Sequence, residues 1–272
     1  MLIALFGSII LVAPALADKD EPIQKPWKKV KVSLGGSLLN VRSTVRVGAK
    51  GIGVSVNPEE LFNMDSTTSV FRIDGFWRFS KNLRHRLDAS WFKTSNKGDT
   101  VLGKDVDIGD TTLPLGTEVK TNLEFDVIKV GYSYSFYQDD RIDLAVGGGL
   151  YVLPIKYNLS ASGLVNESQT ESITAPLPLL GLRADFAITP KWILRNNVDL
   201  FYLKISDYLG GIVDVRIGVE YNPFKNVGFG LSTEALNLRV EAEKGTDVPG
   251  VDFNGAFEIE QIGLFGYLNI YF

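Results

Sequence analysis

The sequence has no cysteine and a single histidine, His85, in its 272 residues. The lack of cysteine fits an exported protein that does not rely on disulfides. A nucleophile activated by a neighbouring histidine needs hydrogen-bond reach, so it could exist only beside residue 85. The net charge of −4 lacks the basic excess of a nucleic-acid-binding protein, and no nucleic-acid partner is expected.

Long apolar runs are also missing after the first 17 residues. A transmembrane helix needs about 20 predominantly apolar residues, and no later stretch reaches this length. Hydrophobic residues nevertheless make up 45% of the chain, a fraction that ordinary soluble proteins share. The spacing of these residues therefore carries the structural information.

The apolar run at the amino terminus is predicted to be a secretory signal peptide over residues 1–17. It contains no charge, it ends in an Ala-Leu-Ala motif at 15–17, and a charged segment follows at 18–21. A small-residue motif of this kind marks a cleavage site. The run lacks a preceding Lys or Arg, and Pro14 interrupts it too early for a spanning helix.

A short lead-in is expected between the signal peptide and the folded domain. Residues 18–29 contain Pro22 and Pro26 and are predicted to be periplasmic, and residues 30–272 are predicted to form one domain. The lysines at positions 25, 28, 29 and 31 are expected near the inner headgroups of the membrane.

The domain alternates apolar and polar residues over long segments. In the last segment, one face is apolar apart from Gly266 and the other is mixed; the apolar face comprises Ile262, Leu264, Leu268, Ile270 and Phe272. Segments near 67–80, 141–153, 180–188 and 208–222 repeat the pattern. Side chains of a strand point to opposite faces with a period of two. These segments are therefore strands with one apolar face and one face that carries charges of both signs.

The pattern predicts ten strands, and they are longer than the five or six residues typical of soluble sheets. Their expected ranges are 30–47, 67–80, 84–95, 117–137, 141–157, 173–188, 191–205, 208–222, 226–242 and 254–272. Two further short strands between residues 48 and 66 would make twelve, and merging strands at 206–208 would make eight. Changes of phase near Val127/Ile128 and Glu234/Leu236 are expected to be β-bulges.

The connections alternate in length. Short turns are predicted at 81–82, 139–140, 189–190 and 222–226, and longer polar loops at 96–116, 158–171 and 243–252. Aromatic residues beside the short turns, such as Trp77, Tyr134 and Trp192, are expected to form an interfacial girdle. Short periplasmic turns and longer external loops are typical of transmembrane barrels. The sequence therefore predicts an all-β fold, a closed antiparallel transmembrane β-barrel of about ten strands.

A terminal phenylalanine on such a strand resembles the C-terminal signature of Gram-negative outer-membrane β-barrels, and the layout is similar to the small OmpW-like and OmpA-like barrels. This resemblance extends over the whole chain after the signal peptide and is architectural. It implies a location in the bacterial outer membrane, with outer-membrane lipid and lipopolysaccharide as partners. It also implies that Phe272 belongs to the assembly signal read by the barrel-assembly machinery. A monomer without a cofactor is expected.

The mixed face is predicted to point into the barrel and to carry a charged network. Its residues are Arg72, Asp74, Arg78, Arg86, Asp88, Lys129, Arg141, Asp143, Arg183, Asp185, Arg195, Asp199, Asp214, Arg216, Glu220, Glu234 and Arg239. Barrels of eight strands are just filled by side chains, whereas porins keep a channel, and ten strands lie close to the filled limit. Unpaired buried charges are costly, so these residues must pair or stay hydrated.

Two readings of this interior stay open. Paired charges could fill the barrel as a structural network, or they could line a narrow mixed-charge path for small polar solutes. Inward glycines would either leave room for such a path or permit close packing; they are predicted at positions 147, 149, 181, 218, 228 and 230.

Catalytic and metal sites have little support in the sequence. His85 shares a face with Leu87, Ala89 and Trp91, so it is expected to point outward at the periplasmic interface. A pair of carboxylates could still act in a glycosidase-like way. Asp105, Asp107 and Asp110 are weak candidates for a divalent cation, since the loop lacks the later bidentate glutamate of an EF-hand. The prediction is that there is no metal site.

Three functions follow from these observations. The first is a non-enzymatic outer-membrane barrel that is either structural or a narrow channel for small polar solutes. The second is a protein whose external loops bind a partner at the cell surface. The third, least favoured, is an outer-membrane hydrolase.

Overall fold

The computed structural model describes residues 26–47, 54–56, 66–108, 111–162, 167–205, 208–242 and 255–272. The predicted signal peptide and most of the lead-in lie outside these residues. Ten long strands form the main sheet: β1 (Val30–Val47), β3 (Thr67–Arg78), β4 (His85–Val101), β7 (Glu118–Gln138), β8 (Ile142–Ser162), β9 (Glu167–Ala187), β10 (Trp192–Ile205), β11 (Tyr208–Tyr221), β12 (Val227–Ala242) and β13 (Gly255–Tyr271).

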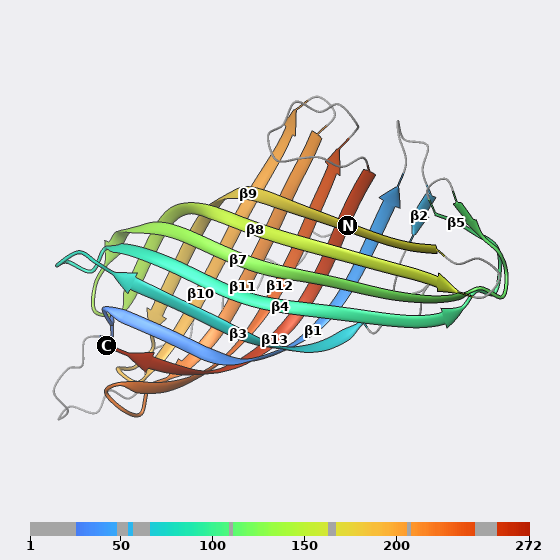
Figure 1. Ribbon diagram of the computed structural model, residues 1–272. Helices are drawn as coiled ribbons and strands as arrows, with labels where there is room; N and C mark the ends of the chain where they lie inside the picture. The colour runs from blue at the N-terminus through green and yellow to red at the C-terminus, as the bar shows by residue number, and fades with distance from the viewer. Residues whose placement is uncertain are drawn as a thin grey trace.

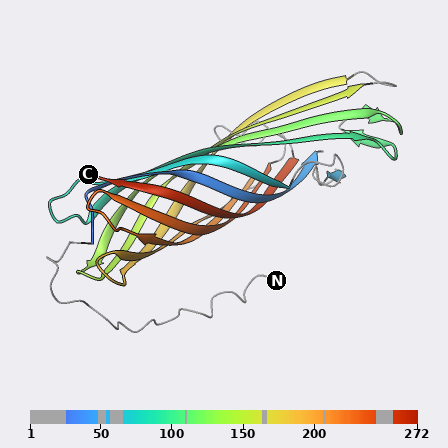
Figure 2. The ribbon, with the colours of Figure 1, turned by 90° about the horizontal axis from the view of Figure 1, so that it is seen from below.

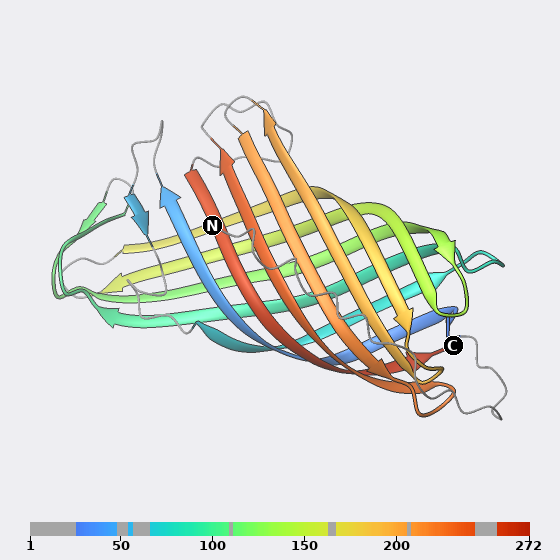
Figure 3. The same cartoon turned by 180° about the vertical axis from the view of Figure 1, so that it is seen from behind.

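The sheet closes on itself into a barrel (Figures 1 and 3). Consecutive long strands pair antiparallel, and β13 returns to pair with β1 from Tyr271 opposite Lys31 to Gly255 opposite Val47. The backbone of Phe272 exchanges two hydrogen bonds with Val30, at 3.1 and 3.3 Å. The predicted fold class and the predicted count of ten barrel strands are therefore confirmed. Among the described residues, no helix is long and apolar enough to cross a membrane.

Short strands outside the barrel wall account for part of the ambiguity in the strand count. β2 (Val54–Val56) pairs with the end of β1, and β5 (Val106–Ile108) pairs with β6 (Thr111–Leu113) in a separate hairpin. Two of the predicted loops are partly wrong, because strands run through them. β4 continues to Val101, β8 continues to Ser162, and β9 already begins at Glu167.

The strands separate into two groups away from the short turns. β3 and β4 pair only between Arg72 and Arg78, and β9 and β10 pair only up to Leu180 opposite Leu200. Beyond these points β4, β7, β8 and β9 run together and diverge from β10–β13 and β1 (Figures 1 and 2). The barrel therefore continues into two facing sheets at the end opposite the turns, which we call the head.

Prolines explain where one ladder stops and where another is interrupted. If β9 and β10 stayed paired, Pro178 and Pro176 would lie opposite Tyr202 and Lys204, and proline has no N–H to donate. Both prolines keep their places in the ladder with β8, so the missing donors belong to the edge that faces β10. Pro154 does the same between β7 and β8, where the ladder skips the positions beside it.

The outward face carries an apolar band next to the turn end of the barrel. Its exposed members include Leu38, Phe71, Trp77, Leu87, Trp91, Val130, Tyr134, Leu150, Leu182, Leu200, Val213, Leu231, Leu264 and Phe272. Past the band, the outward residues become polar, as with Lys93 on β4 and Glu260 on β13. On β7 the band covers about ten residues, the length needed for a tilted strand to cross a bilayer.

Where the outward residues change from apolar to polar, the inward residues change from charged to apolar. On β7 the inward Lys129 is followed by buried Val127, Phe125 and Leu123. The band thus surrounds a polar interior, and the head has a polar surface around an apolar interior. The expected bulge at Val127/Ile128 is wrong, because pairing with β8 keeps one register there, and the register shift lies between Ser135 and Tyr137. The bulge expected at Glu234/Leu236 is also wrong, since β12 keeps one register with both neighbours.

Candidate functional site

The inner layer of charge is the largest concentration of polar chemistry in the described chain. Eight cations and eight anions take part: Lys31, Arg72, Arg78, Arg86, Lys129, Arg183, Arg195 and Arg216, with Asp74, Asp88, Asp143, Asp185, Asp199, Asp214, Glu220 and Glu234. They come from all strands of the barrel except β13, which adds neutral polar groups. The equal numbers leave this layer without net charge.

Asp185 is the centre of the network near the turn end. Its Oδ2 accepts a hydrogen bond from Arg195 Nη1 at 2.6 Å, and Arg86, Arg183 and Arg78 approach the same oxygen at 3.7, 3.8 and 4.0 Å. Asp185 is fully buried. One carboxylate therefore holds four guanidinium groups from β3, β4, β9 and β10.

Glu220 on β11 organises the adjoining part of the layer. Lys31 Nζ and Arg195 Nε donate to its two oxygens at 2.5 and 2.6 Å. The hydroxyls of Tyr267 and Tyr271 also donate to it, at 3.3 and 3.2 Å. Glu220 is completely buried and accepts hydrogen bonds from residues of three strands, so it links β10, β13 and β1.

A third group surrounds Glu234 on β12. Arg72 donates to both of its oxygens, at 2.8 and 3.1 Å, and Arg216 donates to one of them. Asp74 joins through Arg72 at 3.2 Å and Arg216 at 3.4 Å. A separate ion pair joins Lys129 on β7 to Asp199 on β10.

Asp214 differs from the other acids of the layer. Within the described residues it makes no ion pair, and its Oδ2 accepts a hydrogen bond from Tyr151, while Oδ1 has no partner. Its side chain is buried. Tyr151 belongs to the apolar cluster as well, so this pair lies where the charged and apolar layers meet.

Two small cavities lie within the charged layer. A cavity of about 90 Å³ lies among residues including Asp74, Arg86, Lys129 and Glu220, and a second of about 50 Å³ shares Lys129 and Asp199 with it. These volumes suit a few water molecules, because buried water needs two to four polar partners and little space. Unpaired polar atoms in the larger cavity, such as Asp214 Oδ1 and Ser232 Oγ, supply such partners.

One inward glycine illustrates how the layer is packed. A Cβ on Gly230 would lie 2.2 Å from ring atoms of Tyr267, the residue whose hydroxyl reaches Glu220. Glycine at this position therefore makes room for a packed aromatic ring and does not widen a pore.

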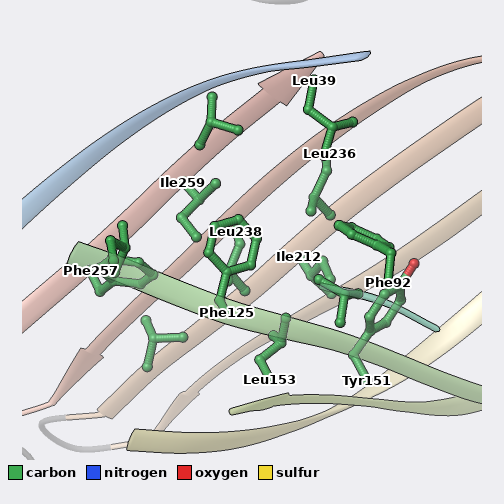
Figure 4. Close-up of a cluster of buried hydrophobic side chains, with 14 of the residues drawn as sticks. Leu39, Phe92, Phe125, Tyr151, Leu153, Ile212, Leu236, Leu238, Phe257 and Ile259 are labelled. Carbon is green, nitrogen blue, oxygen red and sulfur yellow. The ribbon is translucent and has the colours of Figure 1, made fainter. Parts of the chain in front are cut away.

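An apolar layer lies inside the head, next to the charged layer (Figure 4). Its side chains come from both sheets of the head, and Leu39, Phe125, Leu153, Ile212, Leu238 and Ile259 point toward one another with no more than 2% of their surface exposed. The cluster has members or packed neighbours on every long strand. These side chains are buried against one another, so the interior is apolar here and polar in the charged layer.

Most residues predicted for the network lie in this layer, and two do not. Arg141 is exposed in the turn between β7 and β8, because β8 begins only at Ile142. Arg239 points outward beside Glu241, because β12 keeps its register past Glu234. Lys31 was expected near headgroups but is buried against Glu220. Its odd position on β1, shared with inward Ser33 and Ser37, is the signal that could have identified it.

His85 lies on the outward face at the turn end. Its Nδ1 shares a hydrogen bond of 2.7 Å with the Tyr132 hydroxyl, and its ring packs beside Phe79 and Tyr134. This is the position expected from its spacing. Since it is the chain's one histidine, a serine–histidine or aspartate–histidine pair cannot form inside the barrel or at its outer rim.

The metal candidates are only partly described. Asp105 is exposed, and its Oδ1 accepts a hydrogen bond from the Leu115 backbone N–H at 2.7 Å, as an aspartate that orders a loop does. The side chain of Asp107, and Asp110 as a whole, lie outside the described residues. Among the described residues, no group of three or more His, Asp or Glu side chains is arranged to hold a metal ion.

Asp139 and Lys28, which lie outside the strands at the turn end, have shifted pKa values. The hydrogen bond from the Tyr137 hydroxyl, followed by those from the backbone N–H groups of Arg141 and Ile142, lowers the pKa of Asp139. Burial, with the Lys225 ammonium as a second cause, lowers the pKa of Lys28. Asp139 thereby orders its turn as a carboxylate.

Comparison with known proteins gives structural neighbours only. No protein-family model matches the sequence, and no curated protein sequence matches it. The fold is similar to that of the outer-membrane protease OmpT from Escherichia coli, with a TM-score of 0.57 and 11% identity over 93% of this chain and 99% of that one.

Weaker likenesses include the attachment invasion locus protein Ail of Yersinia pestis and the toluene transporter TodX of Pseudomonas putida. The Ail match has a TM-score of 0.36 and 10% identity over 89% of this chain and 99% of Ail. The TodX match has a TM-score of 0.36 and 8% identity over 90% of each chain. The likeness to OmpT shows that the chain has the fold of a bacterial outer-membrane barrel, and an identity this low carries no functional assignment.

Proposed function

We propose that this outer-membrane-type barrel is a closed anchor that presents its head at the outer surface of the bacterium. The charged layer acts as an internal brace within the membrane, and the apolar layer seals the lumen. The protein then has a structural role as an anchor, and its head binds a partner at the cell surface. It does not transport solutes.

The apolar layer is the observation that carries this proposal. A path for small polar solutes needs continuous hydration, yet side chains from all around the barrel fill the head with almost no exposed surface. The charged layer below it contains cavities that suit only a few waters. Both observations favour a closed lumen.

The head supports a surface role because membrane anchoring does not require it. Residues 118–126 of β7 extend beyond the apolar band by roughly 30 Å at about 3.3 Å per residue. Their outward side chains are polar, and they include Glu118, Lys120 and Glu124. A polar-surfaced extension of this length is available to a partner outside the membrane, with lipopolysaccharide as the nearest candidate.

The proposal includes how the chain reaches its site. It is exported by a signal peptide over residues 1–17, and the barrel-assembly machinery recognises the last strand, which ends at Phe272. The exposed ring of Phe272 at the end of the β1–β13 seam is consistent with this role. The barrel acts as a monomer.

Planar-bilayer conductance of the refolded protein tests the closed barrel. We expect no discrete current steps at low or high salt, because ions cannot cross the apolar layer. Heat-modifiable migration on a gel verifies that the inserted protein is folded. Reproducible steps from folded protein would refute the closed anchor and restore the narrow channel.

A further inference from the structure

The segment before β1 crosses the turn end of the barrel, and the proposed function does not use it. Residues 26–29 make hydrogen bonds to two turns on opposite sides of the mouth. The indole Nε1 of Trp27 donates to the Asp139 carbonyl at 2.5 Å, in the turn between β7 and β8. Lys28 Nζ donates to the Lys225 carbonyl at 3.4 Å, in the turn between β11 and β12.

Trp27 is the buried part of this segment. Its side chain is 8% exposed, although three other tryptophans, Trp77, Trp91 and Trp192, point outward and are 40–49% exposed. The Arg78 guanidinium lies over its ring at 5.7 Å. An apolar ring buried at the aqueous end of a barrel must be held by contacts, and the cation–π contact and the Asp139 hydrogen bond provide them.

Arg78 connects this ring to the charged layer. It is fully buried, and it pairs with Asp143 at 2.7 Å and donates to the Leu83 carbonyl at 2.9 Å. Its backbone N–H donates to the Lys29 carbonyl at 2.7 Å, which fixes the segment against β3. A buried guanidinium at the end of a barrel stays desolvated only if something covers it.

We infer that residues 26–29 form a strap across the periplasmic mouth, with Trp27 as the stopper that keeps water and solutes from the charged layer. The lumen is then closed twice, by Trp27 at the turn end and by the apolar layer in the head. Opening the strap exposes the charged layer to the periplasmic side and leaves the barrel non-conducting, because the apolar layer remains.

The absence of native cysteine allows a direct test with a single engineered thiol. Ala145 is an inward residue of β8, 2% exposed and two positions beyond Asp143, and its side chain makes no hydrogen bond to lose. Ala145→Cys is labelled in detergent micelles with a small charged methanethiosulfonate. With Trp27 present, labelling should be slow.

Adding Trp27→Ala should accelerate labelling about tenfold or more, since protection in a folded state follows the free energy of local opening. Trp27→Phe should keep labelling slow, because the ring over Arg78 is retained. Trp192→Ala is the matched control: Trp192 lies at the same end of the barrel but packs outward against Tyr221. Heat-modifiable migration monitors folding in each variant.

An unchanged rate in folded Trp27→Ala, or an equal acceleration by Trp192→Ala, would overturn the strap. If Trp27→Ala does not fold, acrylamide quenching of tryptophan fluorescence tests whether Trp27 is covered. With the three outward tryptophans replaced by phenylalanine, Trp27 fluorescence should resist acrylamide, and free quenching would also overturn it. Conductance distinguishes the two proposals, because Trp27→Ala should still show no current steps if the lumen is closed in the head.

Discussion

At the scale of single residues, the interior of the membrane-spanning part is organised around a few shared carboxylates. Asp185, Glu220 and Glu234 each accept contacts from two or more cations, and each is buried. Burying an ion pair is costly, and the cost is recovered only when the geometry is good and the remaining polar atoms are satisfied. Sharing carboxylates meets that condition because each fixed oxygen serves several donors.

Asp185 tests this arrangement. Among the described residues, Asp185→Ala leaves Arg86 with Asp88 as its ion-pair partner, and it leaves four guanidinium groups partly uncompensated. We expect the free energy of unfolding in urea to fall by about 3–5 kcal/mol, as for other broken buried pairs.

Glu118→Ala provides the control for Asp185→Ala. Glu118 pairs with Lys120, and both side chains are about half exposed. Exposed pairs contribute little to stability, so this variant should unfold like the parent protein. Equal losses in the two variants would mean that the buried network is not the cause.

At the scale of strands, proline residues determine where β9 separates from β10. The sequence contains Pro176 and Pro178 on what is otherwise a regular strand, and the β9–β10 ladder ends just before them. A strand without N–H donors on one side cannot continue a ladder on that side. The same residues protect the free edge of β9 against pairing with another chain.

Replacing both prolines by alanine restores two N–H donors on β9. We expect the ladder to extend, and the backbone amides of residues 201–204 on β10 should then exchange hydrogen more slowly. Pro154→Ala is the control, because it lies between β7 and β8 and should leave the β10 amides unchanged. Exchange at 201–204 that does not slow in the double variant would assign the separation to the packing of the head.

At the scale of the whole molecule, the apolar residues move from the outward face of the strands to the inward face at the end of the apolar band. Within the band the apolar residues point outward to lipid, and in the head they point inward to a core. Each arrangement hides apolar surface from water, and backbone register is the same in both. The molecule is a closed barrel with an apolar outer surface at one end and two facing sheets around an apolar core at the other.

Three arginine substitutions test this change of face. Leu264→Arg places a charge in the lipid-facing band and should cost about 2–4 kcal/mol of folding free energy in lipid vesicles. Asn237→Arg lies on the outer surface of the head and should cost little. Leu238→Arg is the next residue of β12 but points into the core, so it should prevent folding or cost several kcal/mol. A large loss for Asn237→Arg would place the membrane boundary farther out.

The sequence by itself determined the ten strands, the closed barrel and nearly all of the charged layer. Alternation with a period of two is a local property, so it identifies each strand and its two faces without knowledge of the neighbours. It also identified His85 as outward-facing, because its neighbours on the strand are apolar.

Only the tertiary structure decided which face is inside at each height and which charges meet. At Val127 and Glu234 the pattern of hydrophobicity shifts by one residue, and sequence alone cannot separate a bulge from a change of surroundings. The surroundings depend on where lipid ends and the opposite sheet begins. That information lies in contacts between strands far apart in the chain, as do the apolar cluster in the head and the seating of Trp27 against Asp139.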